Sequence, residues 1–137
     1  MRVMVLVKAN KDSEAGVLPD ETILTEMGKF NEALVKAGVL LAAEGLQASA
    51  TSARVRFDGA KRTVIDGPFT ETKELVAGFW LWRVKSMAEA IEWIKRSPFQ
   101  EGEVEIRQVF EVEDFGPALT PELREQEARL RAQAKKL

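Results

Sequence analysis

The stretch from residue 66 to 74, Asp-Gly-Pro-Phe-Thr-Glu-Thr-Lys-Glu, gathers four charged side chains around a Gly-Pro corner. Asp66, just before this corner, could face a cleft as a general base or ligand anchor, or it could form an Asx-turn with the backbone. Glu71 could shuttle a proton while Lys73 holds an anionic substrate, or both could lie in a solvated turn with local ion pairs. We therefore predict Asp66 and Glu71 as candidate catalytic residues and Lys73 as a candidate ligand-binding residue.

Three further side chains could bind a ligand. Trp80 and Trp82 could stack on a flat aromatic molecule, although core or subunit-interface packing is the usual role of such residues. Arg107 could hold a carboxylate through two parallel hydrogen bonds, or it could form an intersubunit salt bridge. We predict Trp80, Trp82 and Arg107 as candidate ligand-binding residues beside Lys73.

The chain contains neither His nor Cys. It therefore lacks an imidazole base, a thiol nucleophile, a disulfide and the nitrogen and sulfur ligands of transition metals. Carboxylate oxygens suit Mg²⁺ or Ca²⁺, but no loop has the ligand spacing for either ion. We predict no metal and no cofactor, and whether the protein is an enzyme stays open.

The charge balance excludes several partner classes. The 137 residues include 20 basic and 22 acidic side chains, so no net field attracts the molecule to nucleic acid or to an anionic membrane. A basic cluster at Arg54, Arg56, Lys61 and Arg62 lacks interleaved aromatics and is interpreted as a solvated face. The longest apolar run, residues 75–81, is too short to span a bilayer. We expect a cytoplasmic protein that binds neither nucleic acid nor membrane.

Hydrophobic periodicity and turn residues give the order of elements. The pattern predicts strands over residues 2–8, 39–46, 75–85 and 103–112, helices from Asp20 to Gly38, from Ser86 to before Pro98 and from Thr120, and a hairpin over 54–65 that turns at Asp58-Gly59. The inward positions of the later elements are predicted at Met87, Ile91 and Ile94, at Val104, Ile106, Phe110 and Val112, and at Leu123, Leu130 and Leu137.

This order is that of an α+β ferredoxin-like domain, a split βαββαβ unit with a hairpin insertion and a C-terminal helix. The first and third strands of the unit are apolar on both faces, as central strands should be, yet two helices can cover only one face of the sheet. The other face would expose an apolar patch larger than monomers usually show. We expect a second copy to cover it in a homodimer, with the C-terminal helix as the rival cover.

The motif at residues 66–74 closely resembles that of the DGPF proteins, the longer branch of the YCII-related family. Other matches lie at Gly38-Val39-Leu40, Ala53-Arg54-Val55-Arg56-Phe57, Ala90-Ile91-Glu92-Trp93 and Val104-Glu105-Ile106-Arg107. The resemblance covers residues 1–116 as one domain and leaves 117–137 as a helical extension. It implies a ferredoxin-like fold paired as a dimeric α+β barrel, in a family without a generally established reaction. Some relatives are encoded beside sigma factors, which suggests a regulatory role.

The chain also departs from that family. The shorter YCII proteins pair a His on the first helix with an Asp in a D-P-F segment, whereas here the helix has no His and Ser97-Pro98-Phe99 occupies the second place. Many DGPF relatives have His-Pro where this chain has Gln47-Ala48. A mechanism based on imidazole is therefore excluded.

Two functions follow. The first is a homodimeric DGPF/YCII-like protein whose cleft, between sheet and helices, binds a small acidic or aromatic molecule with Asp66, Glu71 and Lys73 at its polar end. The alternative is a non-catalytic regulatory module that binds a protein partner through the C-terminal helix.

Overall fold

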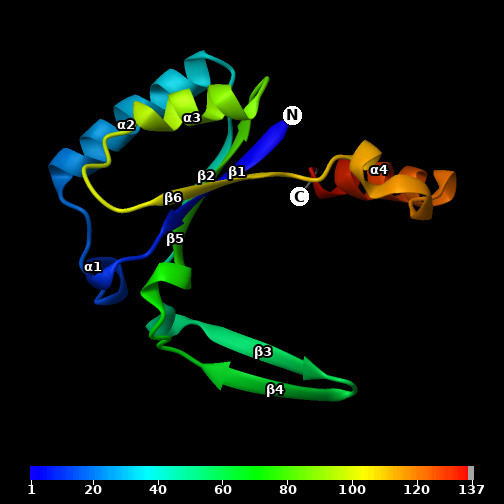
Figure 1. Cartoon of the computed structure of the whole chain (residues 1–137), viewed down its shortest axis with the longest axis horizontal. Helices are drawn as coiled ribbons and strands as arrows, with labels where there is room; N and C mark the ends of the chain where they lie inside the picture. Colours follow the sequence, from blue (N-terminus) through cyan, green and yellow to red (C-terminus); the bar gives the residue numbers. More distant parts are fainter. Residues whose placement is uncertain (136–137) are drawn as a thin grey trace.

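The computed structural model describes residues 1–135, which form an antiparallel sheet with helices on one face and two arms that leave the body (Figure 1). The elements in chain order are β1 (Arg2–Lys8), α1 (Lys11–Glu14), α2 (Glu21–Lys36), β2 (Leu40–Gly45), η1 (Ser49–Thr51), β3 (Ala53–Asp58), β4 (Lys61–Asp66), η2 (Thr72–Glu74), β5 (Val76–Arg83), α3 (Met87–Lys95), β6 (Val104–Gln108), η3 (Val112–Ala118) and α4 (Pro121–Ala134).

The four strands of the main sheet lie in the order β2-β5-β1-β6, and each neighbouring pair is antiparallel. The two central strands are β1 and β5, the two whose residues are apolar on both faces. Two connections contain the helices α2 and α3, so the unit is a split βαββαβ. The predicted ferredoxin-like fold is confirmed. The hairpin β3–β4 forms a separate two-stranded sheet inserted between β2 and β5.

The core lies between the sheet and the two helices. Val3 and Val5 of β1 pair with Trp82 and Trp80 of β5, and all four side chains are buried on the helix side. Phe30 of α2 meets the two indole rings edge-on, with ring centroids 5.8 and 6.3 Å away. Such edge-to-face pairs add specific geometry to the burial of large aromatic surfaces. The apolar residues that alternate along the strands and those that recur along α2 thus pack together in one layer.

Side-chain caps fix where the helices begin. The Asp20 carboxylate accepts the Ile23 N–H at 2.9 Å, Ser86 accepts the Glu89 N–H at 3.1 Å, and Thr120 accepts the Leu123 N–H at 3.3 Å. Each bond satisfies an N–H group that has no partner inside its helix. The predicted starts of α2, α3 and α4 are confirmed.

Two predicted inward faces are wrong in part. On α3 the buried residues are Ala90 and Trp93, whereas Ile91 is 40% exposed. The small Ala90 lets this helix approach the sheet, so the buried stripe is rotated by one position from the stripe of isoleucine and methionine. The last strand ends at Gln108, so Phe110 is exposed and Val112 belongs to η3. There the Glu111 N–H donates to the Asp114 carboxylate and the chain turns away from the sheet.

Two local features differ from the sequence-based expectation. The sequence pattern assigns no helix or strand to residues 9–19, but they contain the short helix α1, because Asn10 and Ser13 cap each other's backbone N–H groups at 2.8 and 2.9 Å. In the hairpin, Asp58 pairs with Lys61, so the two-residue turn is Gly59-Ala60 and not Asp58-Gly59. Gly59 has a φ of 58°, which a two-residue hairpin turn requires at this position.

The β3–β4 hairpin and α4 are arms that extend away from α1 and α2, toward the side of the sheet that no helix covers (Figure 1). Neither arm contains a buried residue. The uncovered face of the sheet carries Met4 and Leu6 of β1 next to Leu81 and Phe79 of β5. Leu137, predicted on the inward stripe of the C-terminal helix, lies outside the described residues.

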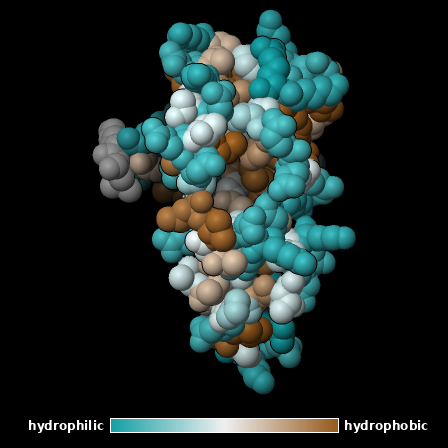
Figure 2. Space-filling model, turned by 90° about the vertical axis from the view of Figure 1, so that its left-hand side faces the viewer, coloured by the Kyte–Doolittle hydropathy of each residue, from teal (hydrophilic) through white to brown (hydrophobic). Residues whose placement is uncertain are grey.

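The opposite side of the molecule is different in character. Figure 2 shows mainly hydrophilic side chains on the side that carries α1 and α2, with smaller hydrophobic patches between them. This surface is typical of one that faces water. Within residues 1–135, no helix is both long enough and apolar enough to cross a membrane.

Candidate functional site

The Asp66-Gly67-Pro68-Phe69 corner joins β4 to η2 and packs closely against the loop around η1. The Gly67 N–H donates to the Ser52 carbonyl at 2.9 Å, and the Phe69 N–H donates to the Ser49 hydroxyl at 2.9 Å. A Cβ on residue 67 would overlap the Ser49 carbonyl oxygen. Residue 67 must therefore be glycine because of a close backbone approach, and the corner is fixed at the base of the hairpin.

Ser49 joins this corner to the N-terminal part of the chain. It is 5% exposed and is the only polar residue that is buried among residues 1–135. Its hydroxyl donates to the Glu14 carboxylate, and its backbone N–H donates to Glu14 Oε1 at 3.0 Å. The hydroxyl also accepts the Phe69 N–H, so it is both donor and acceptor at this junction. We interpret Glu14, Ser49 and Phe69 as an anchor that attaches the hairpin to the body.

The Arg54 guanidinium lies 3.7 Å from the centroid of the Phe69 ring. A cation at this distance is attracted by the face of the ring. This stack occupies one side of a small cavity that Glu14, Gln47 and Ser49 also line. Phe69, the phenylalanine of the motif, therefore packs with a basic residue of β3 and does not enter the main core.

Asp66, Glu71 and Lys73, which were predicted to form the polar end of the cleft, do not line a cavity in the described structure. Asp66, Glu71 and Lys73 are exposed, and none of them lines the cavities described below. Their charged groups make no hydrogen bond or ion pair with another residue of 1–135, so the expected Asx-turn at Asp66 is absent from that range. The catalytic and ligand-binding roles of these three residues stay predictions.

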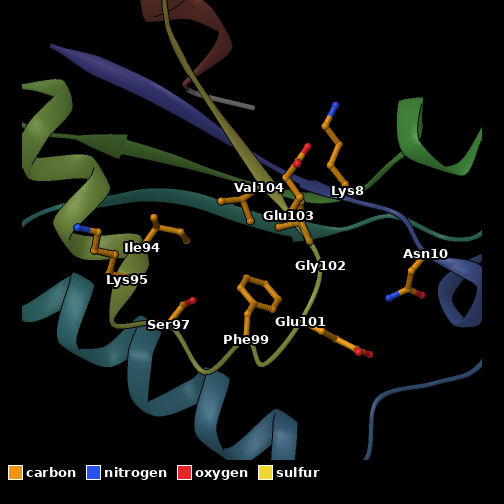
Figure 3. A pocket seen from close by; sticks show the side chains of 11 residues that line it. Lys8, Asn10, Ile94, Lys95, Ser97, Phe99, Glu101, Gly102, Glu103 and Val104 are labelled. Atoms are coloured by element: carbon orange, nitrogen blue, oxygen red, sulfur yellow. The ribbon is translucent and has the colours of Figure 1, made fainter.

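A cavity of about 280 Å³ opens between the sheet and the loop that follows α3 (Figure 3). The Phe99 ring and the Ser97 hydroxyl point into it, Ile94 and Val104 form an apolar wall, and the Asn10 amide lies at its edge (Figure 3). The remaining lining residues are Val7, Lys8, Lys95, Glu101, Gly102 and Glu103. We refer to this cavity as the polar compartment.

A second cavity of about 280 Å³ lies beside it, under α2. Its walls include Met27 of α2 and the Trp80 indole, whose N–H donates to the Asn31 side-chain oxygen at 2.8 Å. The other lining residues are Val7, Ala43, Glu44, Gly45, Ala77, Gly78, Phe79 and Phe99. A Cβ on Gly78 would lie 3.0 Å from the Glu44 carbonyl oxygen, so residue 78 allows β5 and β2 to approach here. We refer to this cavity as the aromatic compartment.

Val7 and Phe99 line both compartments, which makes them neighbours in one cleft between the sheet and the helices. The Phe99 and Trp80 rings meet edge-on, with centroids 5.9 Å apart and planes at 74°. Each compartment is near the lower end of the size range of small-molecule sites. The cleft thus offers two aromatic walls with a few polar groups at one end.

The charged groups around the polar compartment are directed away from its interior. Glu101, Glu103, Lys8 and Lys95 all line this compartment, but the charged ends of their side chains are turned away from Phe99 (Figure 3). Lys8 reaches Glu105 at 3.5 Å and Lys95 reaches Glu92 at 3.1 Å. The polar compartment therefore has no charged group of its described lining directed at its interior.

The three remaining candidate ligand residues have different environments. Trp80 lines the aromatic compartment. Trp82 is fully buried, lines none of the cavities described here, and its indole N–H has no partner among the described residues, which favours core packing. Arg107 lies on the uncovered side of the sheet, with its side chain 71% exposed and 3.7 Å from Glu105. The chain does not bring Arg107 to the cleft.

Sequence reasoning missed Phe99, Asn31 and Ser97 as lining or supporting residues of the cleft. One signal was present, because Ser97-Pro98-Phe99 stands where the shorter YCII proteins have their D-P-F segment. The sequence contained no signal for Asn31, because a single amide side chain on an amphipathic helix is common. In residues 1–135, no group of three or more carboxylates forms a metal site.

One ion pair connects the body to the C-terminal arm. Arg2 of β1 donates to both carboxylate oxygens of Glu111, at 2.8 and 3.2 Å. This hydrogen bonding raises the pKa of the Arg2 guanidinium and lowers the pKa of the Glu111 carboxyl. The paired geometry fixes the point at which η3 leaves the sheet.

Comparisons with known proteins give two similar proteins and one family. An uncharacterized protein of Rhizobium meliloti (strain 1021) is 32% identical over 76 residues, which cover 56% of this chain and 61% of that relative. A solved structure of 5-chloro-2-hydroxyhydroquinone dehydrochlorinase from Burkholderia phenoliruptrix AC1100, in complex with 2,5-dihydroxybenzoquinone, covers 82% of this chain and 97% of its own, with 14% identity and a TM-score of 0.47. A score this low does not establish a shared site. The model of the YCII-related domain matches residues 1–113, and the chain therefore belongs to the YCII-related family.

Proposed function

We propose that this protein is a homodimer that binds a small, uncharged aromatic molecule in the cleft between the sheet and the helices α2 and α3. The observation that carries the proposal is the position of Phe99, whose ring separates the aromatic compartment from the polar one. We assign binding to this cleft and leave the reaction, if one occurs, unassigned.

The walls of the cleft favour a flat ligand. The half-buried Phe99 ring lies at 74° to the buried Trp80 indole, so a planar molecule can stack on Phe99 with Trp80 at its edge. The Trp80 indole is fixed by its hydrogen bond to Asn31. A wall that is already ordered loses little entropy when a ligand binds.

The charges favour an uncharged ligand over an acidic one. An anion in the polar compartment would have no cation directed at it, because the charged ends of Lys8 and Lys95 are turned away from Phe99. A charge that leaves water without gaining an opposite charge is costly to bury. The Ser97 hydroxyl and the Asn10 amide can instead bond to phenolic hydroxyl groups. Of the two ligand classes expected from the sequence, we therefore propose the aromatic one.

The uncovered face of the sheet supports the dimer. Met4, Leu6, Phe79 and Leu81 lie on adjacent central strands there, and no helix within residues 1–135 covers them. A second copy packed around a two-fold axis would remove this apolar surface from water. Sedimentation at micromolar concentration checks this part of the proposal, and a stable single-chain species would contradict it.

Resorcinol and 3-hydroxybenzoate make a matched pair for testing the ligand class, because a hydroxyl replaces a carboxylate on the same ring. We expect resorcinol to quench the tryptophan fluorescence and to raise the melting temperature, since a ligand at about 100 times its Kd adds about 2.7 kcal/mol of stability. We expect 3-hydroxybenzoate to bind more weakly.

Two variants locate the binding. Phe99→Ala should weaken the resorcinol response, whereas Arg107→Ala, on the opposite side of the sheet, should leave it unchanged. Tighter binding of 3-hydroxybenzoate would overturn the proposed ligand class. An unchanged response of Phe99→Ala, or no response of the wild-type protein to either compound, would overturn the cleft.

A further inference from the structure

The β3–β4 hairpin has an apolar face that no other element of residues 1–135 covers; its one cross-strand contact with a charge is that of the Arg62 guanidinium, 4.8 Å from the centroid of the Phe57 ring. Val55 pairs with Val64, and Phe57 pairs with Arg62, so these side chains share one face of the ribbon. Val55, Phe57 and Val64 are 49, 70 and 65% exposed. A two-stranded ribbon is only marginally stable in water without a further strand or a packed helix. This hairpin therefore needs an external surface to hold its conformation.

The C-terminal arm, which we define as residues 110–130, has the same need. Phe110 and Phe115 stack with centroids 5.0 Å apart, yet they are 63 and 49% exposed. Leu123 and Leu130 are seven residues apart on α4 and so lie on one stripe, with 45 and 53% exposure. A helix with few apolar positions gains little stability on its own.

The two arms carry opposite charge. Residues 53–66 of the hairpin contain four basic and two acidic side chains, a net charge of +2. The C-terminal arm contains six acidic and two basic side chains, a net charge of −4. Complementary charge of this kind favours correct pairing over pairing of like arms.

The directions of the arms define how they can meet. In Figure 1 both arms extend past the uncovered side of the sheet, the hairpin at one end and α4 at the other, with a gap between them. Their separation prevents contact within one chain. A second copy that faced this sheet would occupy the space between the hairpin and α4. If the two-fold axis is perpendicular to the view of Figure 1, the partner's α4 lies beside the hairpin of this copy. By the same symmetry, α4 of this copy lies beside the partner's hairpin.

We propose that the two copies exchange their arms, so that the β3–β4 hairpin of each packs its Val55, Phe57 and Val64 face against the C-terminal arm of the other. This inference rests on the homodimer of the proposed function. It adds the axis of the dimer, the contact between arms and a role for residues 110–130. The acidic arm then faces Arg62, which lies on the same face of the second copy's hairpin as Phe57, and α4 is ordered by that contact.

The absence of cysteine from the chain makes a direct test possible. Phe57→Cys and Leu123→Cys are prepared separately, the second with a longer tag, and the two proteins are mixed, allowed to exchange subunits and treated with a short bismaleimide. Each variant carries a single thiol, so every cross-link joins two chains. We expect a cross-linked species of mixed size in high yield. Both positions are exposed, so the substitutions leave the core unchanged.

Glu32→Cys provides the matched control, because Glu32 is exposed on α2, on the other side of the molecule. Its mixture with Phe57→Cys should give no cross-link. A cross-linked Phe57→Cys homodimer in place of the mixed species would overturn the exchange, since it places hairpin beside hairpin. A sedimenting dimer without a mixed cross-link would overturn the exchange and leave the homodimer intact. A single-chain species would overturn both, while resorcinol binding would still report on the cleft.

Discussion

The body of the molecule and its two arms differ in how much apolar surface they bury. Among residues 1–135, the ten buried hydrophobic side chains lie between Val3 and Trp93, in or directly beside the sheet and its two helices, and neither the hairpin nor α4 contains one. Burial of apolar surface is the main favourable term in folding. The body can therefore specify its own structure, whereas the arms depend on a surface that the single chain does not supply.

The largest effect that distinguishes the two regions is expected from removing an aromatic side chain in each. Trp82→Ala removes a fully buried indole and should lower the free energy of unfolding by about 3–5 kcal/mol at every protein concentration. Phe57→Ala removes a ring that is 70% exposed and should cost less than about 0.5 kcal/mol in the dilute, dissociated protein. Urea unfolding over a range of concentrations measures both.

The concentration dependence sharpens this comparison. If the hairpin packs on a second copy, the loss caused by Phe57→Ala grows as the protein concentration rises, because binding stabilises by mass action. A loss as large as that of Trp82→Ala in dilute protein would contradict the distinction between body and arms, since it would require Phe57 to pack within its own chain.

The body is also the part that the sequence could predict. The period of β1 and the capping residues Asp20, Ser86 and Thr120 use local rules, and local rules place strands and helix starts well. The inward face of α3 was misassigned because the fit of Ala90 against the sheet depends on the tertiary distance between layers. The premature end of β6 depends on the Glu111–Asp114 cap, which competes with the strand for the same backbone N–H.

The next effect concerns the junction between the two regions. Gly67→Ala places a methyl group on the Ser49 carbonyl oxygen and should cost about 3 kcal/mol, because backbone on both sides must move. The same substitution at Gly28, in α2 with no atom close to the new methyl group, should stabilise the protein by up to about 1 kcal/mol. Thermal unfolding of both variants gives the comparison. Equal effects would mean that the corner is not anchored to Ser49.

The candidate site shows why its prediction was less complete. The motif around Asp66 is compact in sequence, but its backbone is directed at Ser49 and Glu14, residues that are 17 and 52 positions earlier. Such a long-range contact between a small polar loop and a short helix has no periodic signature. The cleft is formed by single residues of β1, α2, β5 and the loop after α3, and only Trp80 among them was identified from the sequence.

A smaller effect is expected from the charges of the arms. Reversing Arg62, the basic residue on the Val55/Phe57/Val64 face, to Glu should raise the Kd of the dimer by up to about tenfold, since exposed ion pairs each contribute about 1 kcal/mol or less. Reversing Glu122 and Glu125 to Lys in the same chain should restore the affinity if the two arms face each other. Sedimentation at low and high salt measures the change, because salt screens these interactions. A failure of the two glutamate reversals to compensate would place the hairpin against another surface.

The smallest effect concerns the point where the C-terminal arm leaves the body. The Arg2 guanidinium holds the pKa of the Glu111 carboxyl below its usual value, so the pair stabilises the folded state above about pH 4.3, the ordinary pKa of glutamate. This contribution is lost as the pH falls through the lowered pKa, because a protonated Glu111 no longer pairs with Arg2. Glu111→Gln should therefore lower the melting temperature slightly at neutral pH and not below that window. Glu113→Gln, which removes a carboxylate of the same segment that has no ion pair among the described residues, serves as the control. An equal loss from Glu111→Gln at every pH would mean that the charge of the pair does not hold this segment to β1.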